Sequence, residues 1–185
     1  MTPSFIPNAI TIGRLVVSLP LLWMLMNGRF APAFWLALAA GASDALDGFL
    51  ARRYGWRSAL GGVLDPIADK LLVSVCFFGL WWAGELPTWM LAVVIGRDVI
   101  ILLGSLVWWR LNGSFEAAPT TISKLTTVAQ LVLIALMLAH LAHIDAAHVL
   151  VQPLMFATAA VTLASGGDYV LRYGLRAWRM RGRKQ

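Results

Sequence analysis

The sequence predicts an all-α, polytopic integral membrane protein with six transmembrane helices. Of its 185 residues, 59% are hydrophobic and only 13% are charged, and the mean hydropathy is +0.75. A soluble domain of this length needs a polar outer face, which these proportions do not supply. Long apolar stretches instead follow one another with short polar connections, as in a bundle of membrane spans, each of which needs about 20 apolar residues.

Six segments reach that length when polar interruptions are allowed. They are 7–27, 32–52, 61–83, 87–110, 122–143 and 147–169. The first segment lacks the positively charged amino end of a cleavable signal peptide, so we expect it to remain on the protein. We expect residues 1–185 to form a single membrane domain that ends in a basic tail at about 172–185.

The positions of lysine and arginine predict the orientation of these spans. Three arginines follow the second segment, two basic residues follow the fourth, and the tail after the sixth is basic, so these positive charges all lie on one side of the membrane. The connections on the other side contain only one arginine or lysine, Arg29. With six spans, both termini are therefore expected in the cytoplasm. The membrane is expected to be a bacterial-type inner membrane. The tail would anchor this topology or attract anionic lipid. The net charge of +6 does not indicate nucleic acid, because the positive charges lie at membrane edges without an aromatic stacking platform.

Four acids in the second and third segments are the least expected feature of an apolar chain. Each ionised side chain inside a membrane helix costs roughly 2.5–3.5 kcal/mol on the insertion scale. Asp44 and Asp47 are three residues apart and Asp65 and Asp69 are four apart, so each pair shares a helix face. Oxygen ligands without histidine or cysteine suit Mg²⁺ or Mn²⁺. The pattern predicts a site for two such ions, which can activate a phosphoryl centre.

The neighbours of these acids suit a ligand that carries phosphate. Gly48 and Ala51 leave the helix surface open to a substrate, and the planar guanidinium of Arg52 can bind phosphate with two parallel hydrogen bonds. Gly61, at the start of the third segment, permits a close helix contact. Because the acids bracket the connection between the second and third segments, we expect the active site between helices near the cytoplasmic side.

At these positions the chain resembles the CDP-alcohol phosphatidyltransferases. Asp-x-x-Asp-Gly-x-x-Ala-Arg, eight further residues, and Gly-x-x-x-Asp-x-x-x-Asp are matched without a departure, at Asp44, Asp47, Gly48, Ala51, Arg52, Gly61, Asp65 and Asp69. The opening Pro7-Asn8-x-x-Thr11-x-x-Arg14 and the number of spans are also similar to the phospholipid-synthesising branch. The resemblance implies transfer of a phosphatidyl group from CDP-diacylglycerol to an alcohol, with release of CMP.

The resemblance also implies a role for each matched residue. Asp69 would be the general base, and Asp44, Asp47 and Asp65 the main metal ligands, with Asp69 close enough to contribute. The CDP moiety would be bound by residues from three helices, namely Asn8, Gly48, Ala51, Arg52 and Gly61. The family resemblance and the apolar outer faces of the last four spans together favour a homodimer.

The acceptor alcohol is predicted less directly. The stretches Arg57-Ser-Ala-Leu-Gly61-Gly-Val-Leu-Asp65-Pro and Pro119-Thr-Thr-Ile-Ser123-Lys124 resemble cardiolipin synthases, which use phosphatidylglycerol. Phosphatidylglycerophosphate synthases, which use glycerol 3-phosphate, are similar in the same places. In either case Arg97 and Lys124 are the candidates for binding the acceptor's phosphate. Arg97 and Asp98 could instead form an ion pair that only holds helices together, although adjacent helical residues point about 100° apart.

Other polar residues allow further interpretations. His140, His143 and His148 could bind a metal, but solvation at the membrane interface is the simpler account. Tryptophans such as Trp81 and Trp82 are typical of an interfacial aromatic belt. A cation transporter would also carry acids in its helices, but spread along the bundle rather than gathered at one end. A catalytically inactive lipid-binding protein would have lost a motif residue, and none is lost.

Overall fold

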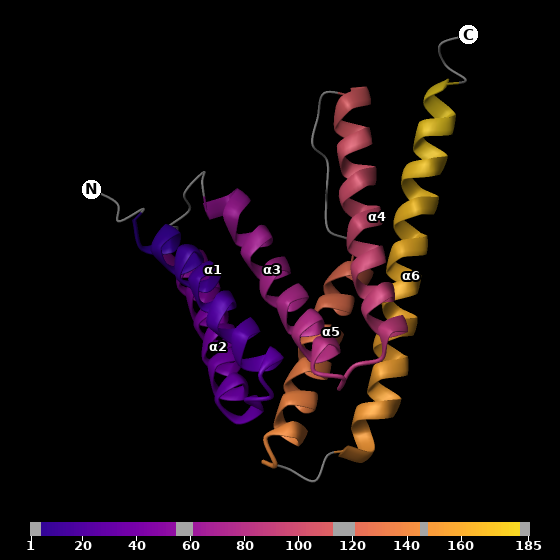
Figure 1. Ribbon diagram of the computed structural model, residues 1–185. Coiled ribbons are helices and arrows are strands. Elements are labelled where there is room, and N and C mark those ends of the chain that lie inside the picture. The colour runs from indigo at the N-terminus through magenta and orange to yellow at the C-terminus, as the bar shows by residue number, and fades with distance from the viewer. Residues whose placement is uncertain (1–4, 55–60, 113–120, 145–147, 182–185) are drawn as a thin grey trace. The chain divides into compact units, whose positions relative to one another are not determined.

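The computed structural model describes a chain made of helices (Figure 1). It describes the backbone of residues 5–54, 61–112, 121–144 and 148–181, and the side chains of residues 13–43, 70–106, 110, 121–144 and 149–172. Within these ranges the secondary structure consists of six helices without a strand, which confirms the predicted all-α class. The helices are α1 (Phe5–Met26), α2 (Phe30–Tyr54), α3 (Gly61–Trp82), α4 (Thr88–Asn112), α5 (Thr121–Leu141) and α6 (His148–Arg181).

The helices follow the predicted segments closely, except at the end of α6. The apolar segment was predicted to end at residue 169, whereas α6 continues to Arg181. Hydropathy marks the part of a helix that can lie in lipid, but a helix continues until a residue disfavours it. The segment after Tyr169 contains no proline, and Arg172 forms a 2.6 Å ion pair with Asp168 one turn earlier. Part of the basic tail is therefore a continuation of α6.

Three helices are long and apolar enough to cross a membrane, judged on the described side chains. Their apolar parts are Thr88–Leu106 in α4, Thr121–Leu141 in α5 and Val149–Arg172 in α6. The described parts of α1, α2 and α3 contribute shorter apolar stretches, Gly13–Met26, Phe30–Ser43 and Lys70–Trp82. A membrane setting accounts for large apolar side chains left on the surface, such as Leu102 at 66% and Leu171 at 65% exposed. The six-span topology stays a prediction.

The chain forms two compact units, and α5 contributes to both. The first unit comprises Met1–Pro87 and Ile134–His148. In it, α1 packs against α2 and α3 (Figure 1). Leu25 of α1 and Phe77 of α3 are fully buried. A Cβ added to Gly79 would lie 2.7 Å from the Cβ of Leu25, so this glycine is what allows α1 and α3 to approach so closely.

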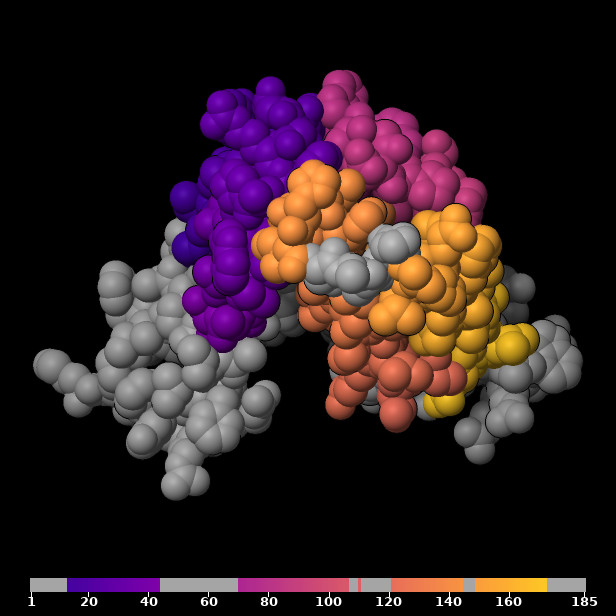
Figure 2. Space-filling view, turned by 90° about the horizontal axis from the view of Figure 1, so that it is seen from below, coloured from indigo at the N-terminus to yellow at the C-terminus, as the bar shows by residue number. Residues whose placement is uncertain are grey.

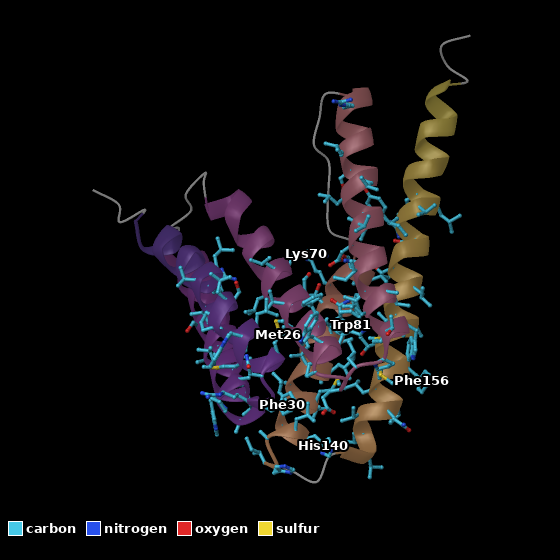
Figure 3. All side chains as sticks on the ribbon, viewed as in Figure 1. Met26, Phe30, Lys70, Trp81, His140 and Phe156 are labelled. Atoms are coloured by element: carbon cyan, nitrogen blue, oxygen red, sulfur yellow. The ribbon has the colours of Figure 1, made fainter. Side chains whose placement is uncertain are left out.

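The second unit comprises Thr88–Leu133 and Val149–Gln185, and hydroxyl groups link its three helices. The hydroxyls of Ser105 in α4 and Tyr169 in α6 lie 2.8 Å apart and are hydrogen-bonded. Thr126 of α5 donates to the carbonyl of Val161 in α6 over 3.4 Å, and the contact of these two helices is visible in Figure 2. Near the other end of α6, Trp89 stacks on Phe156, which Figure 3 labels, with ring centroids 5.6 Å apart.

Three helices end in the same hydrogen-bonding pattern, which requires one residue in the left-handed region. After α1, Gly28 (φ 67°) donates to the carbonyl of Leu25 while Arg29 donates to that of Met24. Gly84 (φ 83°) has the equivalent place after α3. After α5 the left-handed residue is His143 (φ 56°), where glycine would be less strained. These ends turn the chain out of α1, α3 and α5 at residues 28, 84 and 143.

Candidate active site

The matched acids lie on two helices of the first unit. Asp44 and Asp47 are on the last turns of α2, and Asp65 and Asp69 are on the first turns of α3. The backbone is helical at all four positions. The prediction that the two acids of each pair share a helix face assumed a helical backbone, and that assumption is confirmed. The side chains of all four lie outside the described ranges, so their assignment as metal ligands and that of Asp69 as base stay predictions.

The predicted CDP-binding residues lie on the same helices and on α1. Gly48, Ala51 and Arg52 follow the acids on α2, and Gly61 is the first residue of α3. Asn8 is in the first turn of α1, which packs against both α2 and α3. The side chains of these five residues also lie outside the described ranges, so their contacts with CDP stay predictions. On α3 the description of side chains begins with Lys70, next to Asp69 (Figure 3).

Arg97 is buried in the second unit, where its guanidinium is bound by three helices. The residue is 4% exposed. Its Nη1 donates to Oδ1 of Asp98 over 2.7 Å. Its Nη2 donates to the hydroxyl of Ser123 in α5 over 2.6 Å and to that of Ser165 in α6 over 3.0 Å. One side chain of α4 is thereby tied to both neighbouring helices by charge-assisted hydrogen bonds.

The ion pair of Arg97 and Asp98 is formed although the two residues are adjacent. Their Cα–Cβ bonds diverge around the helix, but the long arginine side chain bends back to the carboxylate. The pair lies inside the apolar part of α4, where an unpaired charge would be costly. The structure therefore shows a helix-linking role for Arg97. Its predicted contact with an acceptor stays a prediction.

Lys124, the other predicted acceptor residue, lies at the start of the same network. It follows Ser123 in the first turn of α5, and it is exposed. The neighbouring hydroxyls bond to the backbone, with Thr126 donating to the carbonyl of Ile122 over 2.9 Å and Thr127 to that of Ser123 over 3.2 Å. The structure thus brings Arg97 and Lys124 into one unit, linked through Ser123, with one buried and the other accessible.

The two acids in the apolar parts of α4 and α6 are each paired with arginine. Asp98 binds Arg97, and Asp168 binds Arg172. Among the described residues, no three histidines, cysteines, aspartates or glutamates come together in a way that could hold a metal ion. His140 and His143 are exposed, in keeping with solvation. Asp98 and Asp168 are therefore paired acids, unlike the unpaired carboxylates that an ion pathway would use.

Sequence reasoning missed the role of Ser165. A serine in an apolar helix is common, and its single hydroxyl carries no strong pattern of its own. Gly166 lies beside the same arginine, since a Cβ there would be in ordinary van der Waals contact with Cγ of Arg97, at 3.5 Å. The contact between Arg97 and α6 therefore depends on the folded packing and has no strong signal in the sequence.

Comparison with known proteins identifies the family. Residues 4–164 match the family described as CDP-alcohol phosphatidyltransferase. The human cardiolipin synthase (CMP-forming) is 34% identical over 183 residues, covering 90% of this chain and 61% of the human protein. The chloroplastic CDP-diacylglycerol--glycerol-3-phosphate 3-phosphatidyltransferase 1 of Oryza sativa subsp. japonica is 35% identical over 147 residues, covering 70% of this chain and 45% of the rice protein.

A bacterial relative matches over nearly all of its length. The CDP-diacylglycerol--glycerol-3-phosphate 3-phosphatidyltransferase of Aquifex aeolicus is 26% identical over 173 residues, which cover 90% of this chain and 94% of that protein. The chain spans about half of the rice protein and somewhat more of the human one. The family match includes all eight positions of the acidic motif as well as Arg97 and Lys124. The chain therefore belongs to the CDP-alcohol phosphatidyltransferase family.

Proposed function

We propose that the protein transfers a phosphatidyl group from CDP-diacylglycerol to the hydroxyl of an alcohol and releases CMP. The observation that carries this proposal is the complete eight-position motif, from Asp44 to Asp69, within the family match. The names of two relatives support it. The human protein is called a CMP-forming cardiolipin synthase, and the name of the Aquifex protein includes the donor CDP-diacylglycerol. In this reaction the acceptor oxygen forms a new bond to the phosphatidyl phosphorus, and the diphosphate bond to CMP breaks.

The donor set of the motif suits two divalent ions, Mg²⁺ or Mn²⁺. Asp44, Asp47, Asp65 and Asp69 offer carboxylate oxygens from two helices, and hard cations prefer oxygen ligands. When bound, such ions would neutralise the diphosphate of the donor and stabilise the charge that develops on CMP. Asp44, Asp47 and Asp65 would be the main ligands, with Asp69 as a further one.

The chain's own residues would bind the donor and move the proton. Arg52 would bind the donor through its planar guanidinium, while Gly48, Ala51 and Gly61 leave room for it and Asn8 contributes from α1. Asp69 would accept the proton from the attacking hydroxyl, so that the new bond forms to an oxygen with developing negative charge. Arg97 and Lys124 would serve the phosphate of the acceptor.

Phosphatidylglycerol is the acceptor we propose, with cardiolipin as the product. The human cardiolipin synthase aligns with 90% of this chain at 34% identity. Glycerol 3-phosphate is the alternative, because the Aquifex relative also aligns over 90% of the chain. Both acceptors present a hydroxyl near an anionic phosphate, so a basic residue suits either.

We further propose a single domain with six spans in a bacterial-type inner membrane. Both termini would lie in the cytoplasm. The active site would lie near the cytoplasmic side, and the protein would form a homodimer. The basic residues beyond Arg172 support this orientation. Labelling of a cysteine added at the carboxyl terminus, in a Cys76→Ser background, tests it in sealed vesicles of known sidedness. Labelling only from the periplasmic face would contradict this topology.

An acceptor panel tests the proposed reaction. Purified protein, labelled CDP-diacylglycerol and Mg²⁺ are incubated with phosphatidylglycerol, glycerol 3-phosphate, inositol phosphate or serine in turn. We expect labelled cardiolipin from phosphatidylglycerol. Labelled phosphatidylglycerophosphate from glycerol 3-phosphate would assign the alternative acceptor, and absence of product with all four would contradict the proposed acceptor class.

A further inference from the structure

The surroundings of Arg97 leave little room for an acceptor to contact it directly. Its side chain is 3% exposed, and Nη1 and Nη2 already donate to one carboxylate and two hydroxyls. Its Nε is buried without a hydrogen-bond partner, so it is not turned toward solvent. A phosphate could bind to the fork of this guanidinium only by displacing Ser123 or Ser165.

What Arg97 does hold is the first turn of α5. The first N–H groups of a helix have no acceptor within the helix, so a first turn is easily displaced unless it is tied to something else. Here the Ser123 hydroxyl is bound by Arg97, and Thr126, one turn later, contacts the carbonyl of Val161 in α6. Both hydrogen bonds are made on the buried side of α5. The exposed Lys124 lies between Ser123 and Thr126 in the sequence.

We propose that Arg97 is a positioning residue for acceptor binding, which acts through Ser123 to place the ammonium group of Lys124 at the phosphate of the acceptor. This inference rests on the proposed transferase function and divides the acceptor role between the two basic residues. Lys124 contacts the phosphate, whether that of phosphatidylglycerol or of glycerol 3-phosphate. Ser165 orients the guanidinium of Arg97 from α6, and Asp98 holds it from α4.

The contacts of Ser165 make it the most informative residue to change. Its hydroxyl accepts a hydrogen bond from Arg97, and the residue is 2% exposed, so its surface is covered by the protein itself. Ser165→Ala removes one constraint on Arg97 and leaves Ser123 and Lys124 unchanged. Ser105→Ala is the matched control, because it also removes a hydroxyl bond between α4 and α6, to Tyr169, but has no link to Arg97.

The test measures the KM of the acceptor, the KM of CDP-diacylglycerol and kcat in detergent micelles, separately with phosphatidylglycerol and glycerol 3-phosphate. Ser165→Ala and Ser123→Ala are expected to raise the acceptor KM about threefold to tenfold, the usual worth of one hydrogen bond. The donor KM should stay unchanged. Ser105→Ala should shift the melting temperature as much as Ser165→Ala does, and leave the acceptor KM at the wild-type value.

A double-mutant cycle then separates positioning from direct contact. If Ser123 acts through Lys124, adding Ser123→Ala to Lys124→Ala should raise the acceptor KM no further. Independent, multiplying effects of the two changes would overturn the inference, as would equal effects of Ser165→Ala and Ser105→Ala on the acceptor KM. If the wild-type protein transfers no phosphatidyl group to any acceptor, the proposed function itself is wrong, and this inference with it.

Discussion

Tyr169 of α6 lies so close to Gly104 of α4 that a Cβ on the glycine would be 2.6 Å from Cε1 of the ring. The tyrosine cannot easily move away, because its hydroxyl is hydrogen-bonded to Ser105 and the residue is 9% exposed. The contact is made within the second unit, the unit that contains Arg97 and Lys124. The separation of α4 and α6 at this level therefore depends on the absence of one methyl group.

Replacing this glycine should destabilise the protein. Gly104→Ala is expected to lower the free energy of unfolding by about 1–3 kcal/mol, the usual cost of forcing extra volume into a packed interior. Gly96→Ala is the control on the same helix, since a Cβ there meets nothing within 4 Å. It should be neutral or slightly stabilising, because alanine favours a helix over glycine. Melting temperatures in detergent measure both, and equal values would contradict the packing described.

Replacing the left-handed residue after α5 by glycine should stabilise the protein. His143 has a φ of 56°, a conformation that costs a residue with a Cβ roughly 1 kcal/mol. His143→Gly is expected to raise the melting temperature, and Gly84→Ala, which places a Cβ at φ 83° after α3, is expected to lower it. If both changes lowered it, strain at these helix ends would not be the deciding term.

The metal requirement should depend on the acids of the motif. We expect EDTA to abolish transfer and Mg²⁺ or Mn²⁺ to restore it. Asp65→Asn should raise the Mg²⁺ concentration for half-maximal activity about tenfold or more, because an amide offers one neutral oxygen where the ion favours a charged carboxylate. Asp168→Asn, which alters an acid outside the motif, should leave that concentration unchanged. Full turnover in excess EDTA would rule out the metal site.

The roles of Asp69 and Arg52 can be separated by measuring binding and chemistry independently. Asp69→Asn should lower the single-turnover rate by on the order of 10²–10⁴, the usual worth of a general base, while CDP-diacylglycerol still binds. Arg52→Lys should weaken donor binding, because an ammonium cannot form two parallel hydrogen bonds, but turnover should persist at saturating donor. If Asp69→Asn instead abolished donor binding and kept the rate per bound donor, Asp69 would be a metal ligand only.

The sequence predicts helix positions well where apolar stretches and polar connections alternate. The segment 61–83 was expected and α3 runs from Gly61 to Trp82. The end of α6 at Arg181 could not be predicted in this way, because charged residues mark the limit of lipid contact and not that of helical hydrogen bonding. A local ion pair such as Asp168 with Arg172 favours the helix beyond that limit.

For the site, sequence reasoning identified the acids and glycines but could not assign the network around Arg97. The motif is recognisable because four carboxylates in apolar segments are costly and therefore need a function. Ser123 and Ser165 are 42 residues apart, and each is bonded to Arg97 on a third helix. Such long-range contacts depend on how the helices pack, which the spacing of residues along the chain does not specify.

The most direct test of the central claim is the release of CMP by the purified wild-type protein. CDP-diacylglycerol labelled in the cytidine is incubated with and without Mg²⁺, and with phosphatidylglycerol, glycerol 3-phosphate or no acceptor, and both CMP and the phospholipid product are quantified. We expect CMP release only when acceptor and Mg²⁺ are both present, and with phosphatidylglycerol we expect one cardiolipin formed for each CMP. CMP release at the same rate without any acceptor, or no release with phosphatidylglycerol or glycerol 3-phosphate, would contradict it.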